Sequence, residues 1–162
     1  MSDLLQLHKK PILRPLEKYF GKKIENVADK VDAIITICKE LQREDKYYFP
    51  LCAKERLKLN SEKFINFLKQ KYKTEKGEIF THPYHFNTLG GDCDCQTIYC
   101  LSHLKWLGKE FQSPVEILIL KNTENGRNFF HITQSFNGKI IDFLPYKIPL
   151  GTKVIYKKLY QL

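Results

Sequence analysis

Apolar residues in the first half of the chain recur with a helical period. From about Val27 to Glu44 they fall three or four positions apart, which predicts a helix with one apolar face. Cys38 lies on that face, so we expect it to be a small buried hydrophobe. A second helix is predicted over SEKFINFLKQKYKTE, with Asn60 or Ser61 as its cap. The pattern over residues 46–59 is ambiguous.

The second half of the chain changes to strand-like patterns. We expect a loop over residues 79–92 and then a central helix over residues 93–107. The expected strands that follow are Val115–Leu120, Asn128–Phe136, Lys139–Leu144 and Lys153–Leu159. Helices followed by three or four antiparallel strands predict an α+β fold, and a chain of 162 residues is long enough for one domain of this kind.

An Asn-Gly pair fixes the expected register of two of these strands. Asn137-Gly138 between strand-like runs is a strong hairpin signal. A two-residue turn at this pair places Thr133 opposite Asp142, and makes His131 a diagonal neighbour of Asp142 on the same face. Diagonal side chains are within reach of each other, so the carboxylate could orient the imidazole and select its tautomer.

The segment GGDCDC places a cysteine at the start of the expected central helix. Cys93 begins a stripe that continues into the core, whereas Cys95 lies on the other side of the helix. The unpaired N–H groups and the dipole of a helix start stabilise a thiolate and can bind an oxyanion. Gly90 and Gly91 would permit a sharp turn and close approach of a substrate. The alternative is that Asp92 is only an N-cap and Cys93 only a first-turn residue.

Composition narrows the classes of function. The chain has 27 basic and 18 acidic residues, a net charge of +9, which favours anionic partners weakly. The acidic residues are interspersed and no nucleic-acid-binding motif is present, which disfavours specific binding of nucleic acid. The opening segment MSDLLQLHKKPILRP has no signal-peptide pattern, and five cysteines without zinc-site spacing suggest free thiols in the cytoplasm and no metal. No apolar run is long enough to cross a membrane.

The cysteine, histidine and aspartate segments resemble the transglutaminase-like superfamily of the papain-like fold. The similarity rests on GGDCDCQTIYCLSHLKWLG and FFHITQSFNGKIIDFLP, and the Asn-Thr-Leu before the first segment is similar to short bacterial and phage members. It implies a core over residues 79–162 in which the cysteine helix packs on a three- or four-stranded antiparallel sheet. Residues 1–78 would be a helical region, either within the same domain or as a small docking extension.

Three positions depart from the pattern of this superfamily. Cys95 stands where many members have Asp, Thr97 where many have Ala, and Phe143 where Pro is frequent. None of these changes removes a catalytic group, so they affect the substrate expected more than the chemistry.

The resemblance also implies roles for individual residues. Cys93 would be the nucleophile, His131 the general base and Asp142 the residue that orients it. Asn87, Gly91 and Asp92 would form the oxyanion or substrate-binding site. No metal or cofactor is required.

Two functions are consistent with this pattern. The first is a thiol-dependent acyl-transfer enzyme that acts on a peptide or protein in the cytoplasm. With water as the acceptor it would be a cysteine peptidase or amidase, which small microbial members favour, and with an amine it would be a transglutaminase. The second is a non-catalytic phage or virion structural or assembly protein that retains the fold, with the basic N-terminal region as a docking site for a protein partner.

Overall fold

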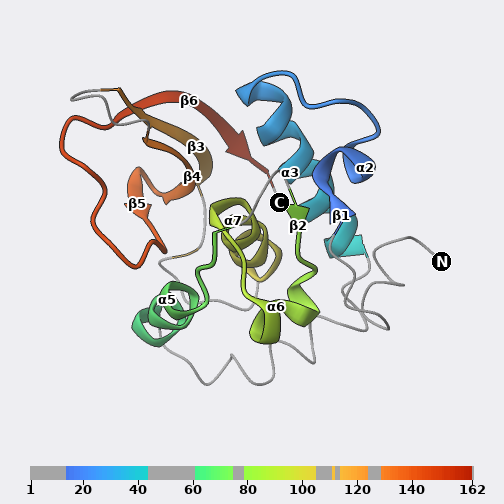
Figure 1. The fold of residues 1–162 in the computed structure, drawn as a ribbon, viewed down its shortest axis with the longest axis horizontal. Helices are drawn as coiled ribbons and strands as arrows, with labels where there is room; N and C mark the ends of the chain where they lie inside the picture. Colours follow the sequence, from blue (N-terminus) through green and yellow to red (C-terminus); the bar gives the residue numbers. More distant parts are fainter. Residues whose placement is uncertain are drawn as a thin grey trace.

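The computed structural model describes residues 14–43, 61–74, 79–104, 111, 114–123 and 129–161 (Figure 1). Its helices are α2 (Leu16–Phe20), α3 (Val27–Arg43), α5 (Ser61–Gln70), α6 (Pro83–Leu89) and α7 (Cys93–Ser102). Its strands are β1 (Arg14–Pro15), β2 (Ile79–Phe80), β3 (Val115–Asn122), β4 (Phe129–Phe136), β5 (Lys139–Ile141) and β6 (Lys153–Tyr160). Within these ranges, no helix is both long enough and apolar enough to span a membrane.

The strands form two antiparallel sheets. β1 and β2 make a two-stranded ribbon, and the larger sheet has the order β5-β4-β3-β6. The expected α+β class, with helices and a four-stranded antiparallel sheet, is therefore confirmed. β5 has only three residues, so β4 continues past the end of its neighbour on that side of the sheet.

The predicted hairpin register is also confirmed. Phe136 pairs with Lys139 and Gln134 with Ile141, as a two-residue Asn-Gly turn requires. Asn137 and Gly138 both adopt positive φ, at 51° and 79°, the conformation of a type I′ turn. The ladder stops at Ile141, so the segment that follows is no longer held as a strand.

Helix α7 is the centre of the fold. Figure 1 shows it between the larger sheet on one side and α3 on the other, with α6 below it. Every residue from Asp94 to Ser102 is at most 1% exposed, so the helix has no solvent-facing side. The expected helix over 93–107 is too long, because α7 ends at Ser102 with His103 as its C-cap; residues 105–110 lie outside the described ranges.

The helices of the first half pack within the same core as α7. The predicted helix from Val27 to Glu44 is confirmed as α3, and Cys38 is fully buried on its apolar face. Buried side chains of α2, α3 and α5 belong to one hydrophobic cluster together with α7 and the sheet. Asn60, one of the two candidate cap residues, and residues 46–59 fall outside the described ranges.

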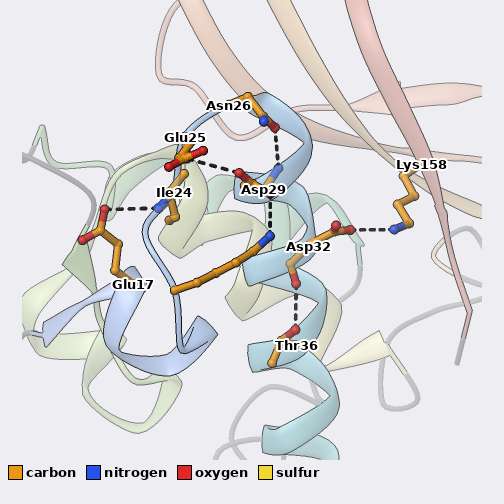
Figure 2. A network of polar contacts seen from close by, with 9 residues as sticks. Glu17, Ile24, Glu25, Asn26, Asp29, Asp32, Thr36 and Lys158 are labelled. Atoms are coloured by element: carbon orange, nitrogen blue, oxygen red, sulfur yellow. Dashed lines mark hydrogen bonds and ion pairs between the residues drawn. The ribbon is translucent and has the colours of Figure 1, made fainter.

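A polar network fixes the start of α3 (Figure 2). The Asn26 side chain accepts a hydrogen bond from the Asp29 N–H at 2.9 Å, which is an N-cap contact. Asp29 in turn accepts from the Glu25 N–H at 3.2 Å and pairs with Lys22 at 3.0 Å. Further along the helix, Asp32 pairs with Lys158 of β6 at 2.6 Å. Helix α3 is thereby anchored at its first turn and tied to the edge strand.

Two expectations about the middle of the chain are wrong. Residues 79–92 are not a single loop, because they contain β2 and α6. Pro83 begins α6, where its fixed φ suits a first helical position and its missing N–H leaves no donor unpaired. The second helix ends at Gln70 rather than near Glu75, because the next residues pair with Gly91: Gly91 donates to the Lys71 carbonyl and Lys73 donates to the Gly91 carbonyl.

Candidate functional site

His131 and Asp142 form a direct side-chain pair. The His131 Nε2 lies 2.6 Å from Asp142 Oδ1, and the Thr133 hydroxyl donates to the same oxygen at 2.9 Å. His131 is buried, whereas the Asp142 side chain is 16% exposed. The diagonal contact predicted from the hairpin register is therefore present, although Asp142 lies just beyond the end of β5.

The hydrogen bonds to Asp142 keep its carboxyl ionised. Burial acts to raise its pKa, but the hydrogen bonds from His131 and Thr133 and the charge of His131 lower the pKa below its ordinary value of 3.8. An ionised carboxylate can only accept a hydrogen bond, so His131 Nε2 is the donor and carries the proton. In the neutral imidazole Nδ1 is then the nitrogen with the lone pair.

Cys93 begins α7 and approaches the strand that carries His131. A main-chain hydrogen bond from Ile132, the residue after His131, acts on the Cys93 sulfur. The sulfur therefore lies against the backbone of β4 beside the histidine. Among the described residues, no hydrogen bond joins this sulfur to the His131 ring itself.

The expectation of a thiolate at the start of α7 is not met in this structure. Burial raises the pKa of Cys93 to about 12, and the carboxylates of Asp94 and Asp92 act in the same direction. The Ile132 hydrogen bond and the charge of Lys30 act in the opposite direction but do not prevail. At neutral pH the Cys93 sulfur is therefore a protonated thiol.

Lys30 of α3 is a site residue that the sequence reasoning missed. Its side chain is only 10% exposed, and its ammonium lies 3.9 Å from Asp94 Oδ2 and 5.8 Å from the centre of the Phe130 ring. Asp94 follows Cys93 in the chain and Phe130 precedes His131, so Lys30 lies close to both of these site residues. A signal was present, because Lys30 precedes the apolar residue Ile34 by four positions and so lies on the buried stripe of α3.

We expect Lys30→Met to slow alkylation of Cys93 by iodoacetamide about 3- to 10-fold at pH 9, because removal of a nearby buried cation disfavours the thiolate. Peptide mass spectrometry at each cysteine measures this rate. Lys158→Met is the matched control, since Lys158 also pairs with an aspartate of α3 but is exposed. Equal rates in the wild type and Lys30→Met would show that Lys30 has no electrostatic effect on Cys93.

Gly91, a predicted substrate-binding residue, is packed closely against α7. A Cβ atom on Gly91 would lie 2.4 Å from Cys95 Cβ, so protein atoms and not a substrate fill this space. Gly90 has φ +67°, and its Cβ would lie 2.4 Å from the Lys71 carbonyl oxygen. Both glycines allow the turn into α7 to pack against Tyr72, which forms a β-bridge with Gly91.

The other two predicted binding residues flank the same turn. Asp92 is the N-cap residue of α7 in an extended conformation, but its side chain makes no capping hydrogen bond. Asn87 lies in α6, and its side chain is outside the described part of the structure.

Three side chains near Cys93 have the types that ligate metals. Asp92, Asp94 and Cys95 place one potential ligand atom each within 4.8 Å of one another. However, the Cys95 thiol donates to the Ile79 carbonyl at 3.2 Å, and Asp94 is paired with Lys30. These contacts account for the orientation of both side chains, so we assign no metal site to them.

Gln96 is a second buried residue that the sequence reasoning missed. Its side-chain amide donates to the Leu68 carbonyl at 2.7 Å and to the Phe143 carbonyl at 3.2 Å. One side chain of α7 thus holds the end of α5 and the residue after Asp142. No sequence pattern could have indicated this role, because both acceptors are main-chain atoms far away along the chain.

The chain was compared with known proteins in three ways. No family model matches it, and no curated protein or solved structure matches it either.

Proposed function

We propose that this protein is a thiol-dependent acyl-transfer enzyme with a Cys93-His131-Asp142 triad, and that it is a cysteine peptidase or amidase. The observation that carries the proposal is the 2.6 Å contact between His131 Nε2 and Asp142 Oδ1. It leaves Nδ1 as the basic nitrogen, while Cys93 lies beside the same segment of β4 at the start of a buried helix. The resemblance to transglutaminase-like enzymes supports this assignment and a papain-like core.

The raised pKa of Cys93 favours a general-base mechanism over a resting thiolate–imidazolium pair. In this mechanism His131 Nδ1 removes the thiol proton as the sulfur bonds to the carbonyl carbon of an amide. The imidazolium then gives that proton to the leaving amine as the C–N bond breaks. A water molecule attacks the thioester, His131 takes its proton, and the carboxylic acid leaves as the thiol is restored.

Two donors would stabilise the oxyanion formed in this reaction. The main-chain N–H of Cys93 is at the start of α7, where the helix dipole favours negative charge. Asn87, six residues before the cysteine, would supply a side-chain donor. Asp142 stays ionised in this cycle and stabilises the imidazolium, as its lowered pKa allows.

A non-catalytic role is the second candidate, and one observation favours it. Burial of Cys93 and the two adjacent carboxylates oppose formation of the thiolate. A structural or assembly protein that retains the fold would have no need for a reactive sulfur. Reactivity of Cys93 towards an acyl donor distinguishes the two functions.

The test is acylation of the folded protein by p-nitrophenyl acetate at pH 7.5. We expect a burst of p-nitrophenol, with the acetyl group on Cys93 as located by peptide mass spectrometry. Cys93→Ser should abolish the burst, whereas Cys95→Ser, a change at a buried cysteine in the same helical turn, should retain it. If Cys93 in the folded protein reacts no faster than in the urea-unfolded chain, the catalytic proposal is wrong and the structural role is favoured.

A further inference from the structure

Two hollows meet at Asp142, and we call them together the Asp142 groove. One has a volume of about 520 Å³ and includes Lys69, Tyr146 and Lys147 in its walls. The other has a volume of about 590 Å³ and includes Lys69 and Lys139. Figure 1 shows α5, which carries Lys69, on the same side of the molecule as β5. Their combined size suits several residues of a bound peptide.

The rim of the Asp142 groove is basic. Lys69, Lys139 and Lys147 are all exposed, and none of them forms an ion pair within the described ranges. Asp142 is the acidic residue in these walls, and its carboxylate accepts hydrogen bonds from His131 and Thr133. Three lysines that form no ion pair with the described residues therefore line the same groove as one carboxylate that is already hydrogen-bonded.

An aromatic pair connects this groove to the nucleophile. The ring centres of Tyr146 and Tyr72 are 6.2 Å apart in an edge-to-face arrangement. Tyr72 is joined to Gly91 through its backbone, two residues before Cys93. Burial and a hydrogen bond with Tyr146 raise the pKa of Tyr72, and the nearby Cys93 and Asp92 act in the same direction. A chain that lies in the groove would thus reach the start of α7.

We propose that the Asp142 groove binds an acidic peptide segment next to the amide bond that is cleaved, a substrate role that rests on the proposed function. Lysine ammonium groups at the rim would pair with Asp or Glu side chains of the peptide. The walls also include Leu144, Ile148 and the half-exposed Tyr146, which suit the apolar side chains of a peptide better than a chain of phosphates.

Binding is tested in the full chain carrying Cys93→Ser, so that catalysis is not needed for the result. The probe is a fluorescein-labelled peptide of alternating Glu and Leu, and anisotropy gives its Kd. The groove variant is Lys69→Gln with Lys147→Gln. The control is Lys153→Gln with Lys157→Gln, which removes the same charge from exposed positions of β6.

We expect the groove variant to bind the Glu-Leu peptide about fivefold more weakly or worse, and the control to bind within about twofold of the parent. A Gln-Leu peptide should bind weakly to all three proteins. Equal losses in the groove and control variants would overturn the proposal, because net charge alone would then explain binding. Tighter binding of a labelled oligouridine, with the same dependence on Lys69 and Lys147, would overturn it in favour of nucleic acid.

The outcome is separable from that of the proposed function. Suppose peptide binding depends on Lys69 and Lys147 but Cys93 does not react with p-nitrophenyl acetate. The groove would then be a peptide-binding site, and the proposal of catalysis would be wrong. If Cys93 is acylated but the Glu-Leu peptide does not bind, the protein would be catalytic and the proposal of an acidic substrate would be wrong.

Discussion

Replacement of His131 with alanine is expected to slow acylation of Cys93 at pH 7.5 by about 10³-fold, within the range that general-base catalysis contributes. The reason is the protonation state of the Cys93 sulfur. A thiol whose pKa is raised to about 12 is almost entirely protonated at neutral pH, so it needs a base in the transition state. The measurement is the burst rate with p-nitrophenyl acetate, followed from pH 6 to pH 9.

The pH profile makes this prediction specific to the base. Without His131 only the thiolate reacts, so the rate should rise about tenfold per pH unit over the whole range. The wild-type rate should depend on pH much less steeply near neutrality, since His131 supplies the base. Parallel profiles in the two proteins would show that His131 does not act on the thiol. His85→Ala is a suitable control because His85 lies in α6, outside the triad.

A substitution at Asp142, the partner of His131, tests the same mechanism in a second way. Asp142→Asn removes the carboxylate that fixes the proton on Nε2, and we expect a loss of about 10²- to 10⁴-fold. Because the pKa of Asp142 is lowered, its carboxylate is charged at every pH above 3.8, the ordinary pKa of the group. It loses its charge only as the pH falls below 3.8. Asp142 therefore contributes no pH dependence between pH 6 and pH 9.

The part of the site that could be predicted from the sequence is local along the chain. The Asn-Gly turn permits one register, and that register brings His131 to Asp142. The α3 helix was equally predictable because its apolar stripe has a regular period. In both cases a short pattern determines the geometry without help from the rest of the fold.

The missed features depend on contacts between distant segments. Helix α7 is buried on every side, so its apolar period could not indicate where it ends. Lys30 and Gln96 have their roles only because α3 and α5 pack against α7. The raised pKa of Cys93 has the same origin, since a cysteine at a helix start has a low pKa only if the surrounding fold leaves it solvated or paired with a cation.

We expect Gly90→Ala to destabilise the protein by about 3 kcal/mol or more, from the combined cost of backbone strain and overpacking, and Gly91→Ala by about 1–3 kcal/mol, from overpacking alone. At Gly90 a side chain must adopt φ +67° with its Cβ 2.4 Å from the Lys71 carbonyl oxygen. At Gly91 the new Cβ would lie 2.4 Å from the Cβ of Cys95. Neither obstacle is the far end of a flexible side chain, so the backbone itself must move.

Urea denaturation measures this effect, and Gly138→Ala is the matched control. Gly138 also has positive φ, at +79°, but nothing lies within 4 Å of its added Cβ, so strain alone should cost about 1–2 kcal/mol. If Gly90→Ala were no more destabilising than Gly138→Ala, the close packing of Lys71 against this turn would be contradicted. Because Gly91 is two residues before Cys93 and the clash is with Cys95 of the same helical turn, we expect the shift that relieves it to displace Cys93 as well. The acylation burst should then fall in folded Gly91→Ala protein.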